Sequence, residues 1–551
     1  MKTSFLLKSS LLATTGVYIL PQLLFAQTST RPHIILIVSD QHRGDAMNCM
    51  GNTSVISPNM DALAEDGTLF TNGYSSTPSS TPARSGLLTG LSPWHHGMLG
   101  YGRVASQYRY EMPRMLGDLN YYSFGIGKMH WYPQKALYGF RGTLVDESGR
   151  VESPDFISDY RLWFQMQAPG LNPDSTHIGW NDHGAATYKL PERLHPTAWT
   201  GEMACEMIRN YEGINNQPLF LKISFARPHS PYDPPQRLLD EYANRDIPAP
   251  WIGEWCKDKP YAKLKDPQKV KKDAPYGNFG DEYAKDSRRH YYANVTFIDE
   301  EIGKVIKTLK EKGIYDNALI CYISDHGDML GDHYHWRKTY PYQGSVHVPY
   351  IVKWPASYHF TKGNKITQPV ELRDLLPTFL EIAGSSIPQD MDGQSLLRLM
   401  EGKTDQWRKY IDLEHATCYS PDNYWCALTD GKIKYIWRFH TGTEELFDLS
   451  KDPHELKNVV TDKKYKQQLN ELRQAMIDHL SERGEKFVKD GKLQVLKQTI
   501  LYSPLFPDKS PVVILNGNFF SKAMMKLIVG FIHTIFNYCI NMDYKSLLTQ
   551  K

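Results

Sequence analysis

The chain has 551 residues, of which 41% are hydrophobic and 23% are charged, and its formal net charge is only +2. This is an ordinary globular composition, long enough for one large domain with a smaller companion. It gives no basis for nucleic-acid binding, and any attraction to an anionic substrate must come from a local cluster of cations.

Residues 1–27 have the pattern of a secretory signal peptide. Two lysines lie before and within an apolar run that ends in small residues near Ala26. Such segments are removed on export, so we expect a periplasmic or otherwise exported protein. A membrane anchor is the alternative, but the run is short and contains Pro21, which disfavours a stable membrane span.

Residues 32–410 alternate between strand and helix patterns and are predicted to form the catalytic domain. The continuous apolar run His33–Val38 indicates a strand buried on both faces. A helix is predicted between Pro58 and Gly67. Further strands and one long helix are predicted at Tyr122–Gly125, Leu219–Phe225, Leu319–Ser324, Val348–Val352 and, for the helix, Val295–Lys312. This α/β order predicts a large, mostly parallel or mixed sheet flanked by helices, with ligands at the carboxyl ends of its strands.

The pattern changes from about Ile411, and residues 411–510 are predicted to form a smaller C-terminal α+β subdomain. Its expected elements are three short strands and one charged helix, at Trp425–Leu428, Ile433–Trp437, Leu446–Leu449 and Lys464–Arg483. The tail, residues 511–551, contains the apolar stretch Met524–Ile540, which is interrupted by polar residues. A packed or amphipathic helix is expected there rather than a membrane span.

The seven cysteines are scattered and lack CxxC spacing, so neither a zinc site nor a dense disulfide scaffold is expected. Cys418 and Cys426 are the two close enough in sequence to pair locally. Cys321 lies inside a predicted apolar strand, where a free, buried thiol is expected.

The segment Ser80-Thr81-Pro82-Ala83-Arg84 is the most specific chemical signal in the chain. Pro82 suits the first turn of a helix and Gly90 suits its end, which places Ser80 at a helix N-terminus. Backbone N–H groups and the helix dipole favour anions there. On propensity alone, however, such a sequence more often only starts a helix.

Two residue pairs that each begin with an aspartate follow predicted strands: Asp40-Gln41 follows the first strand, and Asp325-His326 follows Leu319–Ser324. Carboxylate and amide oxygens at neighbouring strand ends suit a hard divalent ion. Either pair alone is a weak signal, because acidic residues after strands more often cap the next helix.

Three further segments carry cations and histidines. They are Gly127-Lys128-Met129-His130, Arg227-Pro228-His229-Ser230-Pro231, and the run from Gly331 to Lys338. Taken singly, such lysines are usually solvated surface charges and such histidines usually fill or cap loops.

Taken in order, these elements resemble the type I sulfatases, whose signature C/S-x-P-x-R is matched by Ser80 to Arg84. The G-K-x-H and P-H-x-P elements of that family are matched at Lys128 and at His229. The resemblance runs from about Pro32 to Leu449. It implies an alkaline-phosphatase-like fold and the hydrolysis of O-sulfate esters.

The resemblance also implies a role for each matched residue. A serine-type maturation enzyme would oxidise Ser80 to formylglycine (3-oxoalanine), whose hydrate attacks sulfur, and Arg84 would hold that hydrate. Lys128 and Lys338 would bind the sulfate group. His130 would contact formylglycine or assist its collapse to the aldehyde. His229 would protonate the leaving oxygen, for which a protonated His229 is expected in the free enzyme.

One divalent ion, Ca²⁺, is implied, with the ligands Asp40, Gln41, Ser80, Asp325 and His326. Two of these positions depart from the family's usual residues: aspartate is more common at Gln41, and a nitrogen ligand from His326 is unusual for Ca²⁺. Mg²⁺ or Mn²⁺ therefore stays open.

The expected substrate is a sulfated oligosaccharide. The segments His195–Gly201 and Ser224–Pro235 make the chain similar to bacterial glycosaminoglycan sulfatases, including those that remove 2-O-sulfate from unsaturated hexuronates of heparin or chondroitin sulfate. The alternatives are an arylsulfatase, a phosphoryl or phosphonyl ester hydrolase, and a sulfated-glycan binder whose Ser80 is not converted. A two-metal phosphatase would need a second ligand set, for which His333 and His335 are the nearby candidates.

Overall fold

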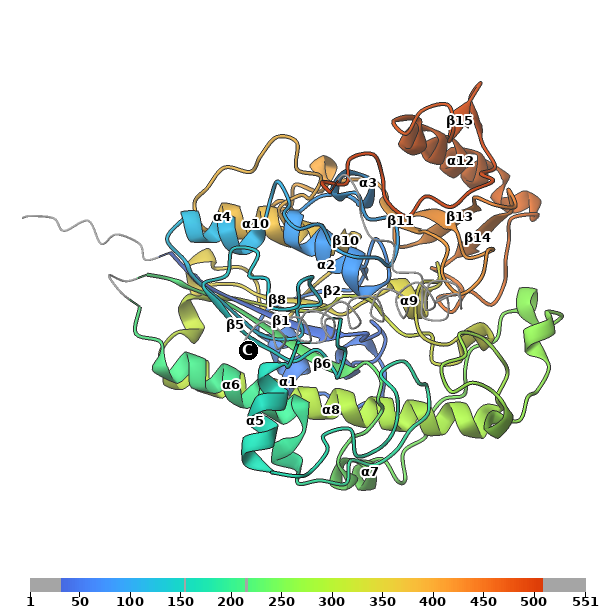
Figure 1. The fold of residues 1–551 in the computed structure, drawn as a ribbon. Coiled ribbons are helices and arrows are strands. Elements are labelled where there is room, and N and C mark those ends of the chain that lie inside the picture. The colour runs from blue at the N-terminus through green and yellow to red at the C-terminus, as the bar shows by residue number, and fades with distance from the viewer. Residues whose placement is uncertain (1–30, 153–154, 214–216, 509–551) are drawn as a thin grey trace, which may run out of the picture.

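The computed structural model describes residues 31–152, 155–213 and 217–508, so the predicted signal peptide and the predicted tail helix Met524–Ile540 lie outside the described residues. A mixed eight-stranded sheet forms its centre (Figure 1). The strand order is β5-β4-β6-β1-β7-β8-β2-β9. In that order the strands are Gly142–Val145, Tyr122–Gly127, Leu219–Pro228, His33–Asp40, Ala318–Ser324, Tyr350–Lys353, Thr68–Phe70 and Asn364–Ile366.

The first five strands of this order are parallel, whereas β8 runs antiparallel to both β7 and β2. At the centre, residues 34–38 of β1 are fully buried, because helices cover both faces of the sheet. The predicted mostly parallel or mixed α/β sheet is therefore confirmed.

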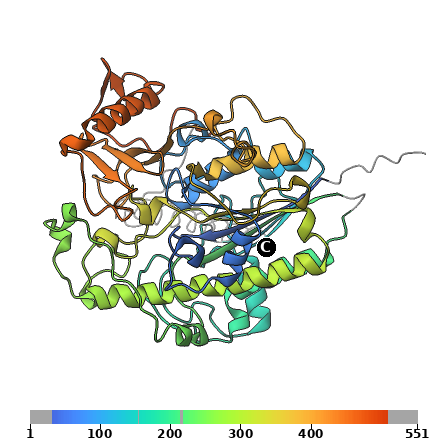
Figure 2. The ribbon, with the colours of Figure 1, turned by 180° about the vertical axis from the view of Figure 1, so that it is seen from behind.

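Helices cover the two faces of the sheet in separate layers, as Figures 1 and 2 show. The apolar side chains of β1 alternate between the two layers. One face packs against α2 (Ser80–Thr89), α4 (Met112–Asp118) and α10 (Leu375–Ile382). The other face packs against α1 (Pro58–Glu65), α6 (Pro196–Asn210), α7 (Gln236–Glu241) and α8 (Asp281–Glu311). Short helices α3, α5, α9 and α11 span Pro93–His96, Asp159–Gln167, Gln343–Val346 and Leu397–Met400, and β3 (Gly73–Tyr74) pairs with β10 (Val370–Glu371).

Helix α8 is much longer than the sequence pattern predicts. It begins at Asp281, not at Val295, and runs along the lower layer of Figure 1. Its first half buries polar and aromatic side chains instead of an apolar stripe, so the periodicity is hidden there. Arg288, for example, is 1% exposed and donates to Asp332 and to the Leu330 carbonyl.

The C-terminal part forms a four-stranded antiparallel sheet and a helix, which confirms the predicted α+β subdomain. The elements are β11 (Ile411–His415), β12 (Trp425–Thr429), β13 (Ile433–Arg438), β14 (Glu444–Asp448) and α12 (Lys466–Ser481), with the small hairpin β15–β16 (Val488–Lys489 and Lys492–Leu493). One face of this sheet packs on α12, and the other packs on Tyr340 and Tyr342 of the large domain. The boundaries predicted for the catalytic domain (residues 32–410) and for the C-terminal subdomain (residues 411–510) stay predictions.

The prediction for Cys321 is confirmed, since this free thiol is fully buried in β7. The pairing of Cys418 with Cys426 was wrong: both residues lie in the described part of the chain and no disulfide joins them. The reason is that Cys426 points from β12 into the core beneath α12, whereas Cys418 lines a cavity next to Tyr340. Among the described residues, no helix has the length and apolar character needed to cross a bilayer.

Candidate active site

The polar segments predicted from the sequence meet at the carboxyl ends of β1, β4, β6 and β7. The register places Ser39 of β1 beside Ser324 of β7, so Asp40 and Asp325 follow at neighbouring strand ends. All ten predicted site side chains gather here, none more than 7% exposed: Asp40, Gln41, Ser80, Arg84, Lys128, His130, His229, Asp325, His326 and Lys338. Their individual roles stay predictions.

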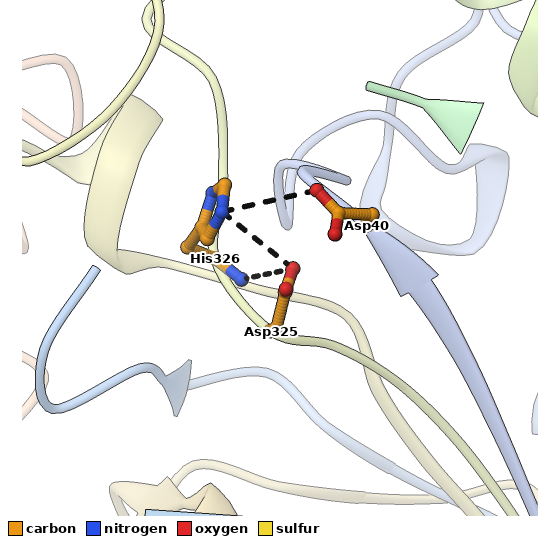
Figure 3. Close-up of side chains that lie close together, drawn as sticks. All are labelled: Asp40, Asp325 and His326. Carbon is orange, nitrogen blue, oxygen red and sulfur yellow. Dashed lines mark hydrogen bonds and ion pairs between the residues drawn. The ribbon is translucent and has the colours of Figure 1, made fainter. Parts of the chain in front are cut away.

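Asp40, Asp325 and His326 form a compact cluster suited to a metal ion, shown in Figure 3. Their ligand atoms lie within 4.8 Å of one another. Asp40 Oδ1 is buried without a hydrogen-bond partner, and His326 Nε2 lies 3.9 Å from it. A buried carboxylate oxygen without a donor is costly unless a cation fills its place. The donor set therefore fits a divalent ion, with Asp40, Asp325 and His326 as the side chains that would hold it.

Ser80 stands at the edge of this cluster, at the first residue of α2. The predicted helix is confirmed, and it ends at Gly90, whose φ of 68° is the left-handed conformation that glycine adopts readily. Ser80 Oγ lies 3.0 Å from His326 Nε2 and donates to Asp40 Oδ2 at 3.4 Å. An oxygen at this position therefore faces both the helix N-terminus and the candidate metal ligands.

Arg84 holds the two carboxylates of the cluster together. Its Nε donates to Asp325 Oδ2 at 2.8 Å and one of its terminal nitrogens donates to Asp40 Oδ2 at 3.0 Å. The other terminal nitrogen donates to the Lys128 carbonyl and to Ser224 Oγ. Burial works against the charged guanidinium, but Asp325 and Asp40 raise the pKa of Arg84 above its ordinary value.

Lys128 and His130 approach from the end of β4. Lys128 Nζ lies 2.6 Å from Asp40 Oδ2. Burial alone would raise the pKa of Asp40, but Lys128 and other cations hold it well below its usual range. Both ring nitrogens of His130 are buried and lack a hydrogen-bond partner. Burial, together with Arg150 and Lys128, keeps the pKa of His130 well below its ordinary value, so this imidazole is neutral.

His229, Lys338 and Gln41 form a second group of polar side chains in the site. The Nδ1 of His229 faces the Ser230 carbonyl at 3.0 Å, so it donates there and Nε2 is left as an acceptor. Lys338 Nζ lies 2.6 Å from that Nε2. Burial and Lys338 keep the pKa of His229 well below its ordinary value, and burial lowers the pKa of Lys338 to about 7. The expectation of a protonated His229 is therefore wrong: the imidazole is neutral, and its Nε2 accepts from Lys338 Nζ.

Gln41 connects the two halves of the site. Its backbone N–H donates to Asp325 Oδ1, and its side-chain oxygen accepts from Lys338 Nζ at 2.7 Å. Its side-chain nitrogen donates to Asp328, which also accepts from Tyr232. The amide is thus already engaged by protein groups, and its role as a metal ligand stays a prediction.

Two residues that the sequence reasoning missed, Glu147 and Arg150, follow β5 and support the site. Glu147 Oε1 accepts from the backbone N–H groups of Met129 and His130, at 3.0 and 2.8 Å. Arg150 is 7% exposed, lies 3.3 Å from Glu147 and has a buried Nε without a partner. Its charge contributes to the low pKa of both Lys128 and His130. No sequence pattern distinguishes Glu147 and Arg150 from other charged loop residues, so the sequence alone could not predict their role.

The histidines without a predicted role lie elsewhere. Within the described ranges, the group around Asp40 is the only cluster of three or more His, Cys, Asp or Glu ligands, so His333 and His335 supply no second metal set. The ring of His333 packs on Trp255, and Nδ1 of His335 donates a hydrogen bond to the His333 carbonyl. His195 accepts the N–H of Thr197 at the start of α6.

Comparisons with known proteins agree with this geometry. Residues 32–385 match the family model described as Sulfatase, and residues 331–482 match the one described as N-sulphoglucosamine sulphohydrolase, C-terminal. An arylsulfatase of Clostridium perfringens is 35% identical, and the match covers 84% of this chain and 97% of the relative.

Two solved structures share the fold. One is a complex with its substrate D-glucosamine-2-N,6-O-disulfate, with a TM-score of 0.64, 22% identity and coverage of 82% of this chain and 98% of that one. The other is the phosphonate monoester hydrolase of Agrobacterium radiobacter, with a TM-score of 0.65, 23% identity and coverage of 88% and 99%. At these identities the likeness concerns the fold alone.

Proposed function

Because this chain belongs to the sulfatase family and is a sulfuric ester hydrolase, we propose that it removes O-sulfate from sulfated glycans through a formylglycine made from Ser80. The observation that carries the proposal is the position of Ser80 Oγ, which lies 3.0 Å from His326 and 3.4 Å from Asp40. A nucleophilic oxygen is therefore held beside the candidate metal ligands and a cluster of cations.

Formylglycine, once hydrated, supplies an oxygen nucleophile for sulfur and a second hydroxyl whose loss of a proton releases sulfate. Arg84 and Lys128 would hold the sulfate oxygens through their positive charge, which acts strongly because both side chains are buried. A divalent ion held by Asp40, Asp325 and His326 would supply Lewis-acid polarisation of those oxygens. We infer Ca²⁺ as that ion.

Proton transfer is assigned to two groups, the Lys338–His229 pair and His130. Lys338 donates to His229 across 2.6 Å, and this pair would deliver a proton to the leaving oxygen. His130 is neutral with both ring nitrogens unpartnered, so it would accept the proton that the second hydroxyl loses. The two steps leave an alcohol and inorganic sulfate.

The finer proposal is a substrate in which sulfate sits on the 2-O position of an unsaturated hexuronate from heparin, heparan or chondroitin sulfate. It is supported by the resemblance stated for His195–Gly201 and Ser224–Pro235. A panel of sulfated disaccharides tests it. Release of sulfate only from 6-O-sulfated hexosamines would refute the hexuronate assignment while leaving the sulfatase proposal intact.

Export and maturation belong to the same proposal. Residues 1–27 would direct the chain to the periplasm or another exported compartment, and a serine-type maturation enzyme would convert Ser80. The test is expression with and without such an enzyme, followed by measurement of sulfate release. The proposal predicts activity only with it. Binding of sulfated glycans without turnover after expression with that enzyme would favour the binder, and preferential turnover of phosphonate esters would favour the phosphonyl hydrolase.

A further inference from the structure

A second hollow lies between the C-terminal sheet and the loops of the large domain. This cavity of about 840 Å³ is separate from the residues of the active site described above. Side chains from three parts of the chain form it: the segment 255–276, the segment 335–342 and the subdomain residues 418–458. Its volume is in the range of ligand-binding pockets.

Aromatic rings make up much of the wall of this cavity. Tyr261 is one of them, with its ring centroid 5.7 Å from that of Tyr276 and 5.3 Å from that of His335. Trp255 and Tyr419 add two further half-buried aromatic faces. Rings arranged in this way offer flat apolar faces beside polar edges, which match the alternating C–H faces and hydroxyl edges of sugar rings.

The polar groups of the cavity point to an anionic ligand that also donates hydrogen bonds. Asn423 is 3% exposed, and its Oδ1 is buried without a hydrogen-bond partner. Within the described ranges, Lys259 and Lys265 form no ion pair, whereas Arg438 is paired with Glu445. Asp422 is the one other carboxylate in the lining. Two unpaired lysines thus outweigh one unpaired carboxylate, and a buried acceptor awaits a hydroxyl group.

The segment Lys338–Tyr340 connects the active site to the cavity. Lys338 reaches His229, while Tyr340, two residues later, lines the cavity. Thr339 between them is held from the subdomain, because its side-chain oxygen accepts from Asn423 at 2.8 Å and its carbonyl accepts from Trp425 at 2.9 Å. A ligand in the cavity would therefore contact the segment that positions Lys338.

We propose that this cavity binds sugar residues that flank the sulfated residue of an anionic saccharide. The aromatic faces of Tyr261 and its neighbours would stack on these sugars, Asn423 Oδ1 would accept a hydroxyl proton, and Lys259 and Lys265 would attract further sulfate or carboxylate groups. The inference rests on the proposed function, which it extends from the ester to the rest of the saccharide.

Calorimetric binding of heparin and chondroitin sulfate tetrasaccharides to the S80A protein tests the cavity without turnover. Tyr261→Ala in that background should weaken binding about tenfold, and Tyr261→Phe, which keeps the ring, by less than about twofold. The double variant K259Q/K265Q should weaken binding and reduce its dependence on salt. Trp251→Ala is the matched control, since Trp251 is exposed and stacks on His454 outside the cavity lining.

Turnover by the converted enzyme gives a second readout. For Tyr261→Ala, the ratio of kcat/KM for a tetrasaccharide to kcat/KM for 4-methylumbelliferyl sulfate should fall about tenfold. The inference would be overturned if neither Tyr261→Ala nor the double lysine variant changed the tetrasaccharide affinity of the S80A protein. Absence of sulfate release from every ester would instead refute the proposed function and leave the calorimetric test valid.

Discussion

Replacing Arg84 by methionine tests whether the buried cation holds the site together. Arg84 donates to Asp40 and Asp325, and both carboxylates are fully buried. Methionine keeps much of the volume and removes the charge. Asp40 would keep its ion pair with Lys128 at 2.6 Å. Asp325 would lose Arg84, the one guanidinium that pairs with it among the described residues.

Breaking a buried ion pair by removing one partner costs about 3–5 kcal/mol, because the remaining charge is left without compensation. At about 2 cal/mol/K of unfolding entropy per residue, a chain of this length loses about 1 °C per kcal/mol. Arg84→Met should therefore lower the Tm by about 3–5 °C in the presence of a chelator. Added Ca²⁺ should recover part of the loss by compensating the charge of the buried carboxylates.

Scanning calorimetry at neutral pH measures this shift, with Arg237→Met as the control. Arg237 also contacts two carboxylates, Glu192 and Glu300, but its side chain is 44% exposed. Exposed pairs contribute at most about 1 kcal/mol, so this control should shift the Tm by about 1 °C or less. Equal shifts for the two variants would refute the assignment of Arg84 as the buried cation of the site.

Further predictions concern the nucleophile, the metal, a neighbouring arginine and a buried lysine. Ser80→Ala should abolish sulfate release with little change in Tm, measured on the same preparation, because the hydrogen-bond partners of its hydroxyl among the described residues are Asp40 and His326 alone. Chelation should abolish activity and lower the Tm, and Ca²⁺ should restore both; activity in metal-free protein would contradict the proposed site. Arg150→Gln removes a charged donor whose buried Nε has no protein partner in the described part of the chain. If that donor binds substrate, KM in steady-state assays should rise about tenfold, which corresponds to one charge-assisted hydrogen bond. Burial lowers the pKa of Lys222 from 10.5 to about 7, so its protonation costs stability most at pH 7 and below, and wild-type stability should rise with pH between those values. Lys222→Met should therefore raise the Tm at pH 6, with a gain that shrinks towards pH 10; a lower Tm at pH 6 would contradict this reasoning.

The central strands and their terminal acidic residues were predictable because burial on both faces requires continuous apolar runs. The run ending at Asp40 and the run ending at Asp325 are of this kind, and parallel pairing then brings their ends together. The start of α2 was equally readable from Pro82, whose ring fixes φ, and its end from Gly90, which adopts the left-handed conformation without strain.

Other features depend on long-range contacts that no local pattern records. The position of Lys338 is set by Thr339, which Asn423 and Trp425 hold from the C-terminal subdomain. The protonation of His229 depends on Lys338, a residue more than 100 positions away in sequence. Burial of Lys222 within β6 contradicts the usual preference of lysine for the surface and is visible only once the sheet is covered.

The most direct measurement is the mass of the tryptic peptide from Gly44 to Arg84, taken from active protein purified from its native host. Our account predicts a peptide lighter than the encoded sequence by two hydrogens, located at residue 80. An intact serine at that position in fully active protein would contradict it.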